Sequence, residues 1–157
     1  MLDAQAQFTD IYHEYIDLVY RIAFMLVKNA AEAEDISQSV FLRLVKNKEP
    51  YENHDHLKAW LIVTTQNCSK DFLKSSWNKK RIPIDKDIVS VDKQLASCEL
   101  REKILSLPDK YKIPLYLYYF EGYKTKEISS ILKIKHATVR TRLKTAKIKL
   151  KDYIEEE

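Results

Sequence analysis

Apolar side chains recur at intervals of three and four residues along almost the whole chain, and runs that alternate strictly between apolar and polar residues are missing. A period near 3.6 residues places apolar side chains on one face of an α-helix, whereas a half-buried strand needs a period of two. The sequence therefore predicts an all-α fold.

The apolar spacing also predicts where the helices lie. Their expected ranges are 8–28, 30–46, 57–77, 95–107, 109–121, 125–132 and 136–154. Residues 48–55 contain proline, asparagine and aspartate, which are typical of a loop. Over residues 78–94 the periodicity fades, and Pro83 interrupts it. We therefore expect two small helical domains, residues 1–77 and 95–157, joined by a flexible linker.

Rare residue types exclude several classes of function. Gly122 is the one glycine, which excludes the phosphate-binding loops that need two or three glycines. Cys68 and Cys98 lack the CxxC spacing of zinc and redox sites, so we expect both to be small core residues in a reducing compartment. The histidines do not combine with acids or cysteines at the spacing of metal ligands, and they are His13, His54, His56 and His136. We therefore expect neither an enzyme nor a bound cofactor or metal.

Hydropathy indicates a chain that folds in water. Apolar residues make up 45% of the composition, which is enough to build a core. No run of 18 apolar residues is present, and the first residues lack the basic and apolar regions of a signal peptide. We expect no direct membrane insertion and a cytoplasmic location.

Charge is distributed unevenly between the two halves of the chain. Residues 1–77 carry 8 basic and 11 acidic side chains, a net charge of −3. Residues 123–151 carry 10 basic side chains against the single acid Glu127, a net charge of +9. The C-terminal segment is thus expected to bind a polyanion, and the two domains are expected to meet different partners.

The C-terminal segment also has the spacing of a helix-turn-helix, because only three residues separate the predicted helices 125–132 and 136–154. The second helix has an apolar seam at Val139, Leu143, Ala146 and Leu150. Beside the seam runs a basic stripe of Arg140, Lys144, Lys147 and Lys151, and Arg142 and Lys149 flank the other side. Between the basic residues lie Thr138, Thr141 and Thr145, whose small side chains allow close approach to a groove. This pattern favours DNA binding, with a solvated basic face as the alternative.

These segments resemble the extracytoplasmic-function sigma factors, two-domain bacterial subunits that bring RNA polymerase to promoters. LPDKYKIPLYLYYFEGYKTKEISSILKIKHATVRTRLKTAKIKL is similar to the family's domain that binds the −35 promoter element. EAEDISQSVFLRL and LKAWLIVTTQNCSKDFL are similar to the domain that binds the polymerase clamp and melts the −10 element. The resemblance implies a sigma factor that binds core polymerase and directs promoter-specific transcription initiation.

The resemblance also implies the partners and the residues that meet them. The partners are the clamp helices and flap of core RNA polymerase, promoter DNA as a duplex at −35 and as a single strand at −10, and an anti-sigma factor. The expected polymerase contacts are Glu34, Asp35, Gln38 and Leu42. The expected −10 contacts are Tyr51, Asn53, His54, Trp60, Asn67, Lys70, Asp71, Lys74, Lys79, Lys80 and Arg81. The expected −35 contacts are Lys126, His136, Thr138, Arg140, Thr141, Lys144 and Lys147.

Each assignment has a plainer alternative. The stripe of Glu34, Gln38 and Leu42 opposes an apolar face of Ile36, Val40 and Leu44, and acids at a helix start also suit the helix dipole without any partner. Trp60 taken alone is a core residue. A DNA-binding regulator that does not engage polymerase would share the C-terminal pattern, and its acidic stripe would then have no partner.

The turn of the helix-turn-helix departs from the family pattern. Lys133 stands where a glycine is usual, so a left-handed backbone there costs about 1 kcal/mol. Lys135 replaces the usual serine cap, and Ala137 replaces another small residue, often glycine. These departures leave the fold intact, but they leave the start of the second helix open.

Overall fold

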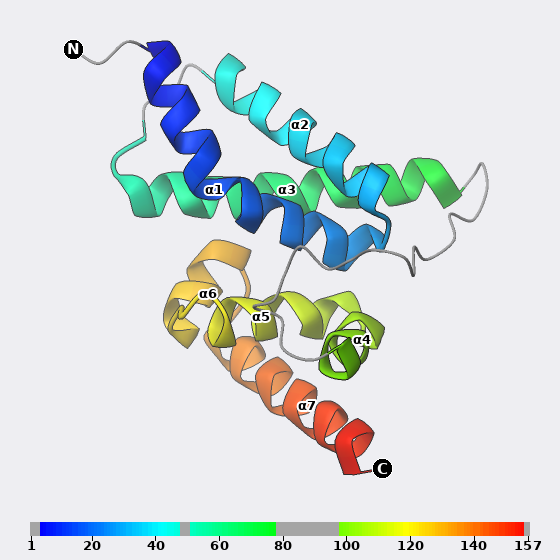
Figure 1. The fold of residues 1–157 in the computed structure, drawn as a ribbon. Coiled ribbons are helices and arrows are strands. Elements are labelled where there is room, and N and C mark those ends of the chain that lie inside the picture. Colours follow the sequence, from blue (N-terminus) through cyan, green and yellow to red (C-terminus); the bar gives the residue numbers. More distant parts are fainter. Residues whose placement is uncertain (1–3, 48–50, 78–97, 156–157) are drawn as a thin grey trace. The chain divides into compact units, whose positions relative to one another are not determined.

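The computed structural model describes residues 4–47, 51–77 and 98–155, and within these ranges every regular element is a helix (Figure 1). The helices are α1 (Ala4–Val27), α2 (Ala30–Lys46), α3 (His54–Trp77), α4 (Cys98–Ser106), α5 (Asp109–Tyr119), α6 (Thr125–Leu132) and α7 (His136–Glu155). The all-α prediction is confirmed. Of the described helices, none combines the length and the apolar character needed to cross a bilayer.

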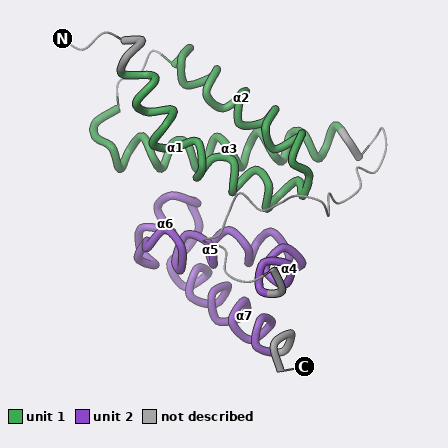
Figure 2. The backbone as a smooth tube through the Cα atoms, viewed as in Figure 1, with its two compact units in different colours: residues 1–88 green, residues 89–157 purple. Residues whose placement is uncertain are grey.

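The chain divides into two compact units, Met1–Ile88 and Val89–Glu157 (Figure 2). The first unit holds α1 to α3, and the second holds α4 to α7. Two small helical domains, the second with a helix-turn-helix, are therefore confirmed. The predicted linker, residues 78–94, lies outside the described residues.

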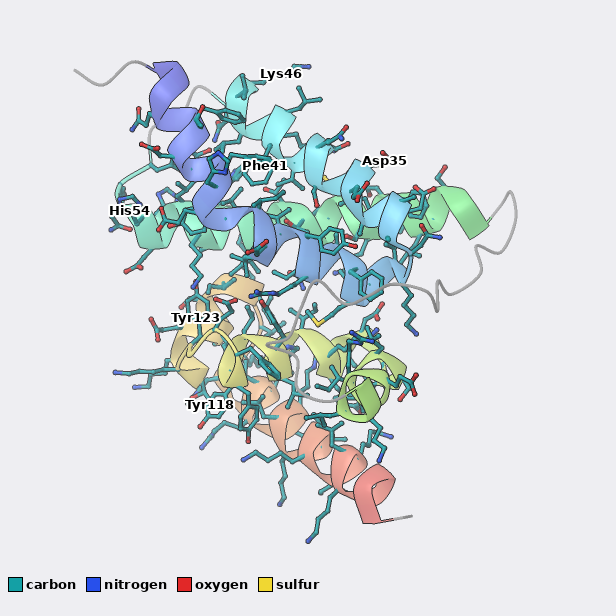
Figure 3. All side chains as sticks on the ribbon, viewed as in Figure 1. Asp35, Phe41, Lys46, His54, Tyr118 and Tyr123 are labelled. Atoms are coloured by element: carbon teal, nitrogen blue, oxygen red, sulfur yellow. The ribbon has the colours of Figure 1, made fainter. Side chains whose placement is uncertain are left out.

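The first unit is a three-helix arrangement in which α1 packs against both α2 and α3, and α2 also contacts α3. Its buried side chains come from all three helices and include Leu18, Ile22, Met25, Ile36, Val40, Leu44, Leu57 and Leu61. Phe41 lies between α1 and α2, where its ring centre is 6.3 Å from that of Phe8 and 4.9 Å from that of Tyr12 (Figure 3). Cys68 is buried in this core, as predicted, whereas the side chain of Cys98 is not among those described.

Asparagine caps decide where two helices of the first unit begin. Asn29 accepts a hydrogen bond from the Glu32 N–H at 3.0 Å, so α2 begins at Ala30, where the spacing predicted it. Asn53 accepts one from the His56 N–H at 2.8 Å, and α3 begins at His54. The expectation that the loop runs to residue 55 is therefore wrong, because a local cap starts the helix before its first apolar residue.

The second unit is organised around α7, which contacts α4, α5 and α6. A cluster of Ile104, Leu107, Leu115 and Ala146 forms its core, and Leu100, Tyr111, Phe120 and Leu150 pack against it. Helix α5 runs through Pro114, as expected. It ends at Tyr119 and not at residue 121, because the chain already turns before Gly122, whose φ of 73° is left-handed as predicted.

The helix-turn-helix has the predicted bounds, α6 ending at Leu132 and α7 beginning at His136. Lys133 takes the left-handed conformation, with φ 55° and ψ 47°. Ser129 closes the turn twice, since its hydroxyl donates to the Ile134 carbonyl and its own carbonyl accepts the Ile134 N–H at 3.2 Å. The hydrogen bonds of the turn thus hold a lysine in a conformation that glycine adopts more readily.

Lys133→Gly should therefore stabilise the second unit by about 1 kcal/mol, because glycine has no Cβ to crowd a left-handed backbone. Denaturant unfolding of the full chain, followed by circular dichroism, measures this change. Lys126→Gly is the matched control: it makes the same substitution at an exposed position in the first turn of α6 and should destabilise by at most about 1 kcal/mol, because glycine is a poor helix former. A lower stability for Lys133→Gly would contradict the left-handed turn.

Candidate nucleic-acid interface and partner surface

The sidedness of α7 agrees with the sequence pattern. Val139, Leu143 and Ala146 are buried against the core of the second unit. All four members of the basic stripe are exposed, namely Arg140, Lys144, Lys147 and Lys151. The three-and-four spacing alone produces this result, because it keeps the apolar seam on one face and the charges on another. An exposed row of cations on a helix-turn-helix is suited to phosphate groups.

The first turns of α7 differ in how far their side chains reach into solvent. His136 is half-buried, and its Nε2 lies 2.7 Å from the Thr125 hydroxyl, which ties α7 to the first turn of α6. Thr138 is half-buried, whereas Thr141 is exposed with its hydroxyl donating to the Ala137 carbonyl at 2.9 Å. Together with Arg140, Thr141 gives this end of α7 a polar surface that is open to a ligand.

Lys126 projects from α6, and it too is exposed. It stands one residue after Thr125, at the end of α6 that the His136 contact joins to α7. The predicted −35 residues thus all belong to the same helix-turn-helix, with one on α6 and the others on α7.

Two tyrosines at the end of α5 were missed by the sequence reasoning. Tyr118 and Tyr119 are 38% and 48% exposed, and Figure 3 labels the first of them. The Lys147 ammonium nitrogen lies 5.4 Å from the centre of the Tyr119 ring. A hydrogen bond with Tyr119 raises the pKa of Lys147, and Coulombic attraction to the ionised form of that tyrosine raises it further. The signal that could have found them is the length of the apolar run, which is too long for every member to be buried.

Helix α2 presents the predicted acidic stripe to solvent. Glu34, Asp35 and Gln38 are exposed, and Leu42 is 57% exposed. The opposite face is buried, as the spacing predicted. Val45 was missed, although it continues the same spacing and is 61% exposed. Figure 3 labels Asp35 and Lys46, which mark the two ends of this surface along α2.

The predicted −10 residues form two groups on the first unit. The first group surrounds Tyr51, whose ring centre lies 5.8 Å from that of His56 and 6.0 Å from that of Trp60. The Tyr51 hydroxyl accepts a hydrogen bond from Asn47 at 2.8 Å, and burial raises the pKa of Tyr51. Trp60 is half-buried, which is intermediate between a core residue and a surface contact. Asn53, at the edge of this group, already uses its side-chain oxygen as the cap of α3.

The second group lies farther along α3 and consists of Asn67, Lys70, Asp71 and Lys74, all exposed. Their spacing of three, one and three residues places them on one helical face. At about 1.5 Å per residue, Asn67 lies roughly 10 Å and Lys74 roughly 21 Å beyond Trp60 along the helix. His54 is exposed at the first turn of α3. Lys79, Lys80 and Arg81 lie outside the described residues.

Comparisons with known proteins agree on what this pair of units is. A family model for sigma-70 region 2 matches residues 11–79, and one for sigma-70 region 4 matches residues 99–150. The ECF RNA polymerase sigma factor SigM of Bacillus subtilis strain 168 is 30% identical over 152 residues, which cover 90% of this chain and 91% of SigM. The chain belongs to the ECF sigma factors.

Further relatives of this sigma factor are consistent with that assignment. SigW of the same Bacillus strain is 28% identical over 159 residues, covering 88% of this chain and 84% of SigW. Among solved structures, the sigma factor RpoE of Bartonella quintana, crystallised with the anti-sigma factor NepR, matches with a TM-score of 0.77. It is 16% identical and covers 95% of this chain and 97% of the other, so the likeness shows a shared fold. The family resemblance drawn from the sequence is confirmed.

Proposed function

We propose that the two units of this sigma factor have different roles in binding polymerase and promoter DNA. As a member of its family it serves promoter-directed transcription initiation by RNA polymerase, and members of this family are not enzymes. Residues 1–77 bind core polymerase and the −10 element, and residues 95–157 bind the −35 element, with residues 78–94 linking them. The family-model matches to residues 11–79 and 99–150 support this division, as do the net charges of −3 over residues 1–77 and +9 over residues 123–151.

The exposed surface of α2 is the proposed polymerase contact. The exposed aliphatic side chains on this surface are the observation that favours the assignment most. Acids near a helix start suit the helix dipole even in an isolated protein, so Glu34 and Asp35 alone would decide little. Leu42 and Val45 are different, because two large aliphatic side chains that are more than half exposed bury little apolar surface in the free chain. Protein interfaces combine such an apolar centre with a polar rim. We infer that the clamp helices of polymerase cover this stripe.

The proposed −10 site runs along α3 and uses both groups described above. The aromatic rings of Tyr51 and Trp60 are suited to stacking on an unpaired base, and Asn67 and Asp71 are suited to hydrogen bonds with base edges. Lys70 and Lys74 carry the charge for the intervening phosphates. Asn53 and His54 border the pocket for a flipped base, and Lys79, Lys80 and Arg81 extend the backbone contacts beyond α3.

The proposed −35 site is α7 with Lys126 of α6 beside it. Helix-turn-helix proteins read bases from the N-terminal part of the second helix, which here offers Arg140, Thr141 and Lys144 to solvent. His136 and Thr138 belong to the same turn but are half-buried, so their share of base contact is smaller. Lys147 lies about two turns beyond Arg140 and is assigned to phosphate.

Two further partners are proposed by family likeness. The Bartonella structure contains an anti-sigma factor, and we extend such a partner to this chain. The polymerase flap is the second, on the C-terminal unit. Since polymerase and promoter both lie in the cytoplasm, we place this sigma factor there. A DNA-binding regulator that does not engage polymerase is the alternative function.

Run-off transcription with purified core polymerase on the upstream region of the chain's own gene tests the proposal. We expect a discrete transcript that depends on adding this chain, because core polymerase alone does not select promoters. DNA binding without any transcript would favour the alternative regulator. A variant with Asp10→Ala and Asp17→Ala, two exposed acids of α1 outside the proposed surfaces, should transcribe as the wild type does.

A further inference from the structure

The end of α5 carries two exposed tyrosines that the core does not need. Leu115, Tyr116 and Leu117, which precede them, are at most 2% exposed and already anchor this helix. Tyr118 and Tyr119 instead face solvent, with their rings edge to face at 4.9 Å and 79°. Tyrosine is enriched at interfaces, because its ring supplies apolar contact area and its hydroxyl supplies a polar group.

The Tyr119 ring lies against a lysine of the basic stripe on α7. The Lys147 ammonium is 5.4 Å from the ring centre, within the range at which a cation is attracted to an aromatic ring. The hydrogen bond that raises the pKa of Lys147 comes from the same tyrosine. The ring of Tyr118 packs edge to face against the ring of Tyr119. The contact with Tyr119 therefore restrains the Lys147 side chain, which stays exposed to solvent.

A second lysine on α7 also lies against a tyrosine ring, but solvent reaches this second pair less. Lys149 lies 5.8 Å from the ring centre of Tyr111, but both residues are half-buried, and Tyr111 packs against the core cluster. Lys147 and Tyr119, in contrast, are both exposed, and Lys147 lies on the side of α7 that carries Arg140 and Lys144. The two pairs thus differ in whether a ligand can reach the cation.

We propose that Tyr119 is a positioning residue, which fixes the Lys147 ammonium for a DNA phosphate and extends the DNA-binding surface from α7 onto the end of α5. A free lysine on a helix samples many rotamers, and ordering it on DNA costs conformational entropy. A lysine already restrained by a ring loses less on binding. This inference rests on the proposed function of α7, and it concerns affinity for the DNA backbone and not the choice of sequence.

A double-mutant cycle with the full chain tests the inference. The probe is a short fluorescein-labelled DNA duplex of arbitrary sequence, since a phosphate contact needs no promoter, and anisotropy is titrated at several salt concentrations. Lys147→Ala should lower the slope of log affinity against log salt by about one. Tyr119→Ala should weaken binding severalfold in the wild type and have no further effect in Lys147→Ala, because its role acts through that lysine. Tyr119→Phe keeps the ring and should retain part of the affinity.

Two outcomes would overturn the inference. Equal weakening by Tyr119→Ala in both backgrounds would mean that the tyrosine does not act through Lys147, and no weakening in the wild type would mean that it does nothing for binding. A variant with Lys147→Ala and Lys151→Ala, two exposed lysines of the basic stripe, keeps these outcomes apart from a failure of the proposed function. If that variant binds the duplex with the affinity and salt dependence of the wild type, the basic stripe of α7 does not contact the DNA backbone, and the proposed function fails together with the inference.

Discussion

Replacing both Asp35 and Gln38 by alanine should weaken binding of core RNA polymerase by roughly 10- to 100-fold, as expected when two polar contacts of one interface are lost together. Both side chains are exposed on α2 and face away from its buried side, so the fold has no need of them. Helix content by circular dichroism and affinity for duplex DNA should therefore stay unchanged. Polymerase affinity is measured by fluorescence with labelled sigma factor and purified core enzyme.

The control for this experiment removes charge from the same unit at another face. Asp10→Ala with Asp17→Ala takes two carboxylates from exposed positions of α1, and polymerase binding should survive it. Leu42→Ala with Val45→Ala, in contrast, should weaken binding as the acidic pair does, because these aliphatic side chains would be buried at the centre of the interface. If core binding is unaffected by both α2 variants, the assignment of this stripe to polymerase is wrong.

Arg140→Ala should reduce the discrimination between the cognate −35 element and a scrambled one by about 1–3 kcal/mol, the usual cost of removing an arginine that reads a base. Lys147→Ala should leave the same ratio intact and reduce the salt dependence of binding to both duplexes, because a phosphate contact carries no sequence information. The upstream region that supports run-off transcription supplies the cognate duplex. Titrations at several salt concentrations measure both effects together.

The contradicting result concerns the register of α7 on DNA. An equal loss of affinity for both duplexes in Arg140→Ala would assign this residue to the phosphate backbone. A different residue of the first turns would then read the base. The turn at Lys133 would be the first feature to re-examine, because its left-handed backbone determines the direction in which α7 leaves α6.

Features that depend on neighbours along the chain could be predicted from the sequence. The bounds of α6 and the buried and exposed faces of α2 and α7 follow from spacing within one helix. Lys133 could also be singled out, since a short turn between two helices leaves few backbone conformations. The family could be identified from the sequence because the resemblance depends on such local patterns and on their order along the chain.

Features that depend on the approach of distant segments could not be predicted. Lys147 and Tyr119 are 28 residues apart, and only the packing of α5 against α7 brings the ring to the lysine. The early start of α3 depends on a single cap at Asn53, which the apolar spacing does not report. The separation of the −10 residues into an aromatic group near Tyr51 and a polar group near Asn67 also depended on knowing where the helix begins.

The hydrogen bond between Thr125 and His136 has a consequence for how promoter preference evolves. Because this hydrogen bond joins α6 to the first residue of α7, we expect a change at Thr125 to alter the position of α7, the helix that we propose reads bases. Related sigma factors would then acquire new −35 preferences through a position outside the proposed base contacts. Regulons of close relatives would then diverge even where every base-contacting side chain is the same.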